Sequence, residues 1–204
     1  MAKLLFFDTT HTYTVDGEVI PSVSEICRFI SREIYGDIGQ FTLDNAAKRG
    51  TAVHKSTEVL DKYGKVEITS DIEPYIRAYI QFRKDHACEW QKIEWATHHP
   101  DNLYAGTLDR YGTVDGKRAI VDIKSTANID PAHRKLYEAA QNLYRKMLPE
   151  DMPVEQLLIL QLKNDGTYKL YDLPISDGLA DACLLLHTAL KKRKRKKKEK
   201  TENE

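Results

Sequence analysis

The chain has 204 residues, of which 41% are hydrophobic and 30% are charged, and its 31 basic residues balance 31 acidic ones. This composition is typical of a globular protein and excludes a wholly disordered chain. No apolar run approaches the roughly 18 residues of a membrane helix, and the N-terminus lacks the apolar segment of a secretory signal. We therefore expect a cytoplasmic protein with no membrane segment.

The charge is distributed unevenly along the chain. Residues 191–204 contain nine basic and three acidic residues, which leaves 22 basic and 28 acidic residues in the rest. Because like charges repel, this basic tail is expected to be disordered, and such tails commonly bind nucleic acids without sequence preference. An address signal and a contact with anionic membranes are the alternatives. The tail residues assigned to nucleic-acid binding are Lys191, Lys192, Arg193, Lys194 and Arg195.

The first elements are a predicted β-hairpin and a helix. Strand-like segments flank Asp16-Gly17, a dipeptide that favours a type I′ turn. Ser22 and Glu25 have the spacing of a capping box, which predicts a helix from there to about Ser31. Residues 32–41, which include two glycines, are predicted to form a loop.

Two helices are predicted next. Residues 42–63 have a helical pattern, with Gly50 as a candidate break. Ser70 and Glu73 form a second capping-box pattern, and Pro74 stands in the first turn, where proline is tolerated.

The remainder of the chain alternates between strands and helices. Asp115-Gly116 is a second tight-turn signal, and an Asn-Asp-Gly sequence separates two later strand-like segments. Predicted strands cover 90–99, 103–114, 117–125 and both arms of 154–173, and predicted helices cover 131–148 and 176–190. This order indicates an α/β or α+β protein with helices around a mixed sheet. A body of this length suits one domain.

The hairpin around Asp115-Gly116 carries an unusual set of charges. A two-residue loop there places Asp109 directly opposite Asp122, with Cβ atoms about 5 Å apart, and Lys124 on the same face. Opposed carboxylates are destabilising unless a cation lies between them, and Mg²⁺ prefers such oxygen ligands. A solvated patch on an exposed hairpin is the alternative. The apolar sequence around Asp122 and Lys124, "AIVDIK", favours a central strand and hence a site.

Four motifs together resemble one known family. "GTLD" followed by "VDIKST" resembles the split motif of the PD-(D/E)XK nuclease superfamily. "RGTAVHKSTE", the Glu94 in "KIEWA", and "YEAAQNLY" are similar to motifs of its RecB-type exonuclease branch. Asp122 stands where glutamate is commoner in that family, and the spacing from Gln141 to Tyr144 is one residue shorter than usual.

The resemblance implies a fold and a domain organisation. The expected fold is a restriction-endonuclease-like αβββαβ core, in which helices flank a mixed central sheet, with an N-terminal β-hairpin added. Residues 1–40 would pack on this core as a hairpin and helix, residues 41–190 would form the nuclease domain, and residues 191–204 would form the basic tail.

The resemblance also implies a metal site. Asp109 and Asp122 would hold one or two Mg²⁺ or Mn²⁺ ions, with His54 and the backbone carbonyl of Ile123 as further ligands. Lys124 would orient or deprotonate the attacking water, or offset charge on the phosphate. The three cysteines, Cys27, Cys88 and Cys183, suit neither a disulfide framework nor a four-thiolate cluster, so no iron–sulfur cluster is expected.

Several further residues have two open interpretations. Glu58 lies one turn beyond His54, where it would orient the imidazole or be a solvated carboxylate, and Glu94 is a site residue or an exposed strand residue. Gln141 is assigned with Tyr144 to the catalytic site, because both share a helical stripe with Tyr137 and a buried amide needs partners. A phosphate contact and a solvated face are the alternatives for Arg134, Lys135 and Arg145.

These features predict a divalent-metal-dependent nuclease that hydrolyses DNA, with an exonuclease favoured over an endonuclease. Its similarity to phage and prophage proteins suggests a role in recombination, repair or replication, with DNA and a single-strand-annealing or other recombination protein as partners. The main alternative is a nuclease-fold protein that binds DNA or a partner without catalysis. A metal-dependent enzyme that acts on another substrate is the third hypothesis.

Overall fold

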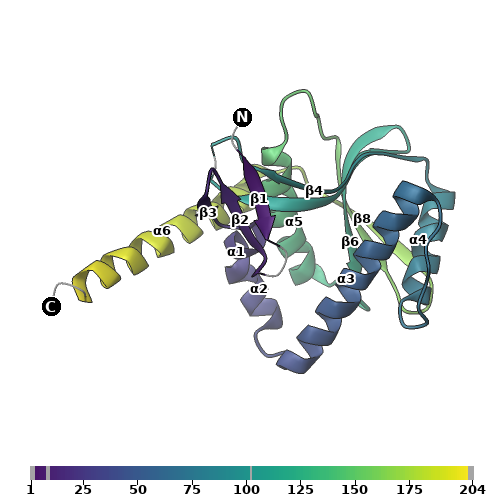
Figure 1. Cartoon of the computed structure of the whole chain (residues 1–204), viewed down its shortest axis with the longest axis horizontal. Helices are drawn as coiled ribbons and strands as arrows, with labels where there is room; N and C mark the ends of the chain where they lie inside the picture. The colour runs from purple at the N-terminus through teal and green to yellow at the C-terminus, as the bar shows by residue number, and fades with distance from the viewer. Residues whose placement is uncertain (1–2, 8–9, 102, 202–204) are drawn as a thin grey trace.

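The described part of the chain forms two β-sheets and six helices (Figure 1). The computed structural model describes the backbone of residues 3–7, 10–101 and 103–201, and side chains as far as Lys191. Within these ranges, no helix has both the length and the apolar character needed to cross a bilayer.

The N-terminal sheet has the predicted strands and turn. Its antiparallel order is β1 (Leu4–Phe7), β2 (Thr12–Val15) and β3 (Glu18–Ile20). The φ angles of Asp16 and Gly17 are 50° and 87°, as a type I′ turn requires. This sheet lies beside the body of the protein (Figure 1). Its strand β1 contacts β4 (Cys88–His98), the first strand of the larger sheet.

The helices that follow are longer than predicted. The expected capping box is present, since Ser22 and Glu25 cap each other's backbone at α1 (Val23–Ile26). The predicted loop at 32–41 is reduced to residues 36–39, because α2 (Arg28–Tyr35) continues into it and packs Ile34 and Tyr35 against the core. α3 (Gln40–Tyr63) runs through Gly50 without a break.

The start of α4 differs from the predicted cap. α4 spans Glu73–Asp85, with Ile72 at the N-cap position and no side-chain cap, so the capping box at Ser70 was wrong. Pro74 does stand in the first turn, as predicted. Burial of Ile72 and Ile76 against the sheet fixes this end of the helix in place of a polar cap.

The larger sheet has the order β4-β5-β6-β7-β8, with β6 and β7 parallel and the other pairs antiparallel. α5 connects the two parallel strands, so the succession α3, β4, β5, β6, α5, β7 reproduces the predicted αβββαβ core. The mixed sheet flanked by helices is therefore confirmed. The element bounds are β4 (Cys88–His98), β5 (Ala105–Val114), β6 (Lys117–Ser125), α5 (Pro131–Met147), β7 (Gln156–Leu162) and β8 (Tyr168–Leu173).

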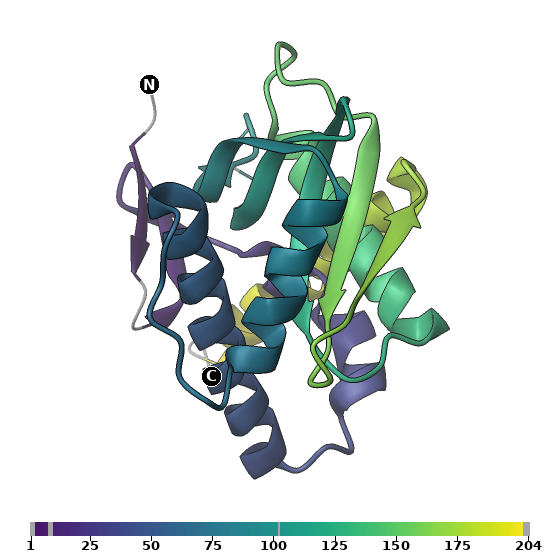
Figure 2. The ribbon, with the colours of Figure 1, turned by 90° about the vertical axis from the view of Figure 1, so that its right-hand side faces the viewer.

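Helices cover both faces of this sheet (Figure 2). α3 and α4 pack on one face, where Val53 and Phe82 contact a cluster that includes Ile123. α1, α2 and α5 pack on the other face, together with the start of α6 (Asp177–Thr201). The central strands therefore have no face that is open to solvent.

The last helix extends away from the body (Figure 1). We expected the basic tail to be disordered, whereas the backbone of α6 is helical as far as Thr201. Lys191 is exposed, and the side chains of 192–195 lie outside the described part of the structure.

Candidate functional site

The register of the β5–β6 hairpin is the predicted one up to the site. Pairing runs from Val114↔Lys117 at the turn to Arg110↔Val121, and the β-bulge lies in β4 rather than in this hairpin. The ladder ends there, because the Asp109 carboxylate accepts a hydrogen bond at 2.7 Å from the backbone amide of Ile123. Asp109 thus binds the neighbouring backbone, rather than forming the predicted directly opposed pair with Asp122.

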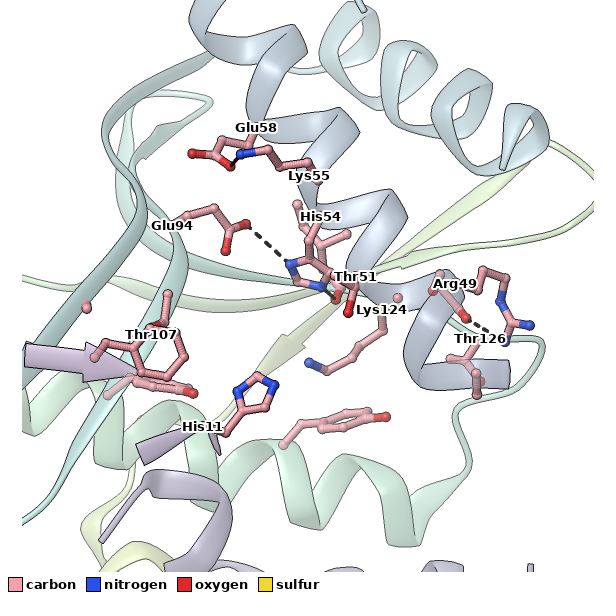
Figure 3. A pocket seen from close by; sticks show the side chains of 18 of the residues that line it. His11, Arg49, Thr51, His54, Lys55, Glu58, Glu94, Thr107, Lys124 and Thr126 are labelled. Carbon is pink, nitrogen blue, oxygen red and sulfur yellow. Dashed lines mark hydrogen bonds and ion pairs between the residues drawn. The ribbon is translucent and has the colours of Figure 1, made fainter. Parts of the chain in front are cut away.

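Three side chains from three elements meet beside this break in the ladder, and Figure 3 shows two of them, His54 and Glu94. His54 on α3, Glu94 on β4 and Asp109 on β5 each offer one ligand atom, and these atoms lie within 4.8 Å of one another. We call these three residues the His–Glu–Asp cluster. Glu94 has a φ of 45°, a strained conformation of the kind that concentrates at functional sites. An imidazole and two carboxylates suit a divalent cation.

Both ring nitrogens of His54 face hydrogen-bond acceptors. Nδ1 lies 3.3 Å from Glu94 Oε1 and 3.5 Å from Asp109 Oδ1, and Nε2 lies 3.0 Å from the carbonyl oxygen of Ile123. Only the doubly protonated ring can donate in both directions. Burial acts to lower the pKa of His54, but the charges of Asp109 and Glu94 outweigh it and raise the pKa to about 9.

This proton gives the site a testable pH dependence. A metal ion needs the neutral imidazole, so binding must release the His54 proton below a pH of about 9. We expect the affinity for Mn²⁺ to rise with pH up to that value, with proton release visible by calorimetry in buffers of different ionisation enthalpy. Without metal, the stability that protonated His54 contributes is complete below its ordinary pKa of 6.5 and is lost as the pH rises through about 9. Proton release that is unchanged in His54→Gln would contradict this assignment.

Lys124 and Asp122 form a pair next to the cluster. Lys124 Nζ lies 2.6 Å from Asp122 Oδ2 and 5.5 Å from the ring centroid of Tyr137. Burial acts to lower the pKa of Lys124, but the carboxylates of Asp122 and Asp109 outweigh it and raise that pKa. Burial raises the pKa of Asp122, to which the charge of Asp109 adds. The two charged residues of the predicted acid–x–lysine motif, Asp122 and Lys124, therefore form an ion pair with each other.

Arg110 is a site residue that the sequence analysis missed. Its side chain is fully buried, and it donates to Glu94 Oε1 at 3.0 Å, to Asp61 Oδ2 at 2.7 Å and to Thr57 Oγ1 at 3.0 Å. It also donates to the backbone carbonyl of Asp109 at 2.7 Å. Arg110 therefore links α3 to the carboxylate of Glu94 and to the backbone of Asp109. The sequence does contain a signal for this role, because Arg110 is a charged residue within a strand that helices cover on both faces. Such a buried side chain requires a partner of opposite charge.

A cavity of about 780 Å³ opens beside the cluster. Tyr144 lines it and packs against Gly106, where a Cβ atom would lie 2.6 Å from the Tyr144 ring, so glycine is required in the "GTLD" segment. Arg49 also lines it and donates to the carbonyl of Ser125 at 3.4 Å (Figure 3). Of the predicted residues, the cavity lining includes His54, Glu58, Glu94, Ile123, Lys124, Tyr137 and Tyr144.

Two predicted residues have contacts other than the expected ones. Glu58 does not contact the imidazole, because Lys62 at 2.6 Å and Lys55 at 3.5 Å bind its carboxylate; the carboxylate that holds the His54 ring is Glu94. Gln141 is buried and donates to the carbonyl of Leu158 at 3.0 Å, and it is not among the residues that line the cavity.

The basic residues of α5 lie away from the cavity. Arg134 is exposed, Lys135 pairs with Glu138 at 2.8 Å, and Arg145 pairs with Asp177. None of the three basic residues is among the described residues that line the cavity.

Comparisons with known proteins find only distant similarity. The chain is similar to the alkaline exonuclease LHK-Exo from Laribacter hongkongensis, with 14% sequence identity, a TM-score of 0.39, and coverage of 88% of this chain and 91% of that one. It is similar to LHK-Exo in complex with dAMP, with 14% identity, a TM-score of 0.40, and coverage of 89% and 94%. It is also similar to SSO0001, with 13% identity, a TM-score of 0.35, and coverage of 81% of this chain and 75% of that one. No family model and no curated protein matches the sequence.

Proposed function

We propose that the protein is a divalent-metal-dependent deoxyribonuclease that hydrolyses phosphodiester bonds, and that it acts as an exonuclease. The observation that carries this proposal is that the His–Glu–Asp cluster and the Lys124–Asp122 pair lie beside one cavity, which His54, Glu94 and Lys124 line. Phage or prophage recombination, repair or replication, with a single-strand-annealing protein as a partner, is the context that the sequence motifs suggest.

The residues present fit a divalent cation. His54, Glu94 and Asp109 would hold it, with Asp122 and the Ile123 carbonyl close by as further oxygen donors. A bound divalent ion would supply Lewis-acid polarisation of the phosphate and a more acidic water. When no cation is bound, the proton on His54 and the ammonium of Lys124 would balance these carboxylates.

The chain's own residues would act on the water and the phosphate. Hydrolysis adds a water oxygen to phosphorus and breaks the bond to one ester oxygen, which leaves with a proton as a hydroxyl group. Lys124 would orient the water or offset the charge on the phosphate, because its ammonium lines the cavity. Tyr137 and Tyr144, which line the same cavity, would contact the nucleotide. Arg110 would keep Glu94 and Asp109 in place.

The direct test is a cleavage assay. The protein is incubated with linear and circular DNA, single- and double-stranded, in Mg²⁺, Mn²⁺ or EDTA. We expect metal-dependent release of nucleotides from linear DNA, and none in EDTA. Cleavage of circular DNA would indicate an endonuclease instead. An absence of cleavage in every combination would favour the second candidate, a DNA-binding or partner-binding protein that uses the same cavity only to hold a ligand.

The basic tail gives a separate prediction. Deletion of residues 191–204 removes nine basic side chains. We expect weaker binding to long DNA, a smaller dependence of affinity on salt, and unchanged cleavage of short oligonucleotides. Filter binding over a salt series measures the first two. Unchanged affinity at low salt would show that the tail does not contact DNA.

A further inference from the structure

The N-terminal sheet contributes an aromatic wall to the catalytic cavity. Phe6 on β1, Tyr13 on β2 and His11, in the segment just before β2, all line the same cavity as His54 and Lys124. The ring centroids of Phe6 and Tyr13 are 4.6 Å apart in a stacked arrangement, and those of Phe6 and His11 are 5.7 Å apart. We call Phe6, His11 and Tyr13 the aromatic wall. Figure 3 shows His11 across the cavity from His54, with the Lys124 amino group extending between them.

This wall is fixed relative to the proposed metal site. The hydroxyl groups of Tyr13 and Thr107 lie 2.9 Å apart, and Thr107 is on β5, two residues before Asp109. Tyr13 is 7% exposed, whereas Phe6 is 36% exposed, so one ring is anchored in the body and the other presents its surface. His11 has a φ of 46°, a strained backbone conformation that Glu94 of the cluster also adopts. Such conformations concentrate at functional sites.

We propose that the aromatic wall stacks on a nucleobase of an unpaired DNA end whose phosphate lies at the His–Glu–Asp cluster. This inference rests on the proposed function and specifies its substrate class as single-stranded or frayed ends. Aromatic side chains next to a phosphate-binding site are the usual platform for single-stranded nucleic acid, because every base offers a π-face. Bases inside a duplex have both faces covered by their neighbours, so only an unpaired or terminal base can use such a wall.

The size and charge of the cavity agree with this occupant. A volume of about 780 Å³ lies in the range of small-ligand sites and can hold a nucleotide but not a base-paired stack. The cationic groups of Lys124 and Arg49 line the cavity together with the wall, so one ligand that carries both an anion and a flat ring matches these cations and the wall. An apolar loop of a protein partner would match the wall but not these cations.

The test measures stacking without cleavage. Oligonucleotides that carry the fluorescent base 2-aminopurine at a single-stranded end, or in the middle of a duplex, are titrated with the protein in Ca²⁺. We expect quenching of the single-stranded end and none of the internal base. Phe6→Ala should remove the quenching and weaken binding of the single-stranded end roughly 5- to 100-fold. Phe6→Leu, which keeps an apolar contact to Tyr13, should lose the quenching while keeping the fold.

A matched control is next in the chain. Phe7 is 48% exposed, is not among the residues that line the cavity, and points to the other face of the same strand. The Phe7→Ala variant should therefore quench 2-aminopurine fluorescence and bind the single-stranded end as the unmodified protein does. Equal quenching by the Phe6 variants and the unmodified protein would overturn the inference. An absence of quenching by the unmodified protein would also overturn it, and would leave a protein partner as the occupant of the wall.

The outcome also separates this inference from the proposed function. Metal-dependent cleavage with quenching that does not depend on Phe6 would keep the nuclease and reject the stacking platform. Quenching that depends on Phe6, without cleavage in Mg²⁺ or Mn²⁺, would keep a single-strand-binding wall and reject the nuclease.

Discussion

Replacement of Lys124 by alanine is expected to lower metal-dependent DNA cleavage about 10²- to 10³-fold, the range lost with one positioned donor that stabilises developing charge. Lys124 Nζ is the cation nearest to Asp122, at 2.6 Å, and it lines the cavity beside the His–Glu–Asp cluster. Loss of the ammonium would leave the attacking water without its orienting donor. Single-turnover cleavage of linear DNA in Mg²⁺ measures the effect on the chemical step.

The same variant should show a stronger stabilisation by metal. Without Lys124, the carboxylate of Asp122 loses its paired cation in a buried setting, which is destabilising. A bound divalent ion would restore the balance, so Mn²⁺ should raise the thermal midpoint of Lys124→Ala more than that of the unmodified protein. The matched control is Lys135→Ala, because Lys135 is an exposed lysine that pairs with Glu138 on α5. Normal cleavage by Lys124→Ala would show that this lysine has no catalytic role.

The parts of the fold that sequence predicts well are those decided by neighbouring residues. Asp115 and Gly116 have φ angles of 49° and 80°, and this turn alone sets the hairpin register that brings Asp109 and Asp122 to the same end. The Ser22 capping box is equally local. The end of α2 and the start of α4 depend on packing against the body, which the local pattern does not contain.

The candidate site divides in the same way. Lys124 and Asp122 come from one strand, so their proximity follows from a two-residue spacing. The partner of His54 does not follow from spacing: Glu58 lies one helical turn away, but two lysines of the same helix bind it. Glu94 reaches the imidazole because β4 adopts a positive φ there, which no local residue pattern predicts.

Replacement of the buried residue Arg110 is expected to lower the free energy of unfolding strongly. Arg110→Met leaves the buried carboxylate of Asp61 with fewer donors and Glu94 without its arginine partner. Loss of one partner from a buried ion pair costs about 3–5 kcal/mol, a large part of the 5–15 kcal/mol that is typical of a whole domain. Urea unfolding monitored by circular dichroism measures this loss of stability.

A conservative variant separates positioning from stability. Arg110→Lys keeps the positive charge, but one ammonium group cannot reach Glu94, Asp61, Thr57 and the Asp109 carbonyl as the guanidinium does. Because groups that orient metal ligands typically contribute 10- to 100-fold in affinity, we expect Mn²⁺ binding to weaken by about that factor. Calorimetric titration below the unfolding temperature of the variant measures this affinity.

Arg83 supplies the matched control for this effect. It also pairs with Asp61, but the described contacts of its side chain are to Asp61, Cys88 and Trp90, and none reaches Glu94 or Asp109. Arg83→Met should therefore lower stability while leaving the affinity for Mn²⁺ unchanged. If both arginine variants weaken metal binding equally, the loss would come from general destabilisation of α3. If only Arg110→Lys weakens it, the guanidinium holds the Glu94 carboxylate and the Asp109 backbone in the arrangement that the metal requires.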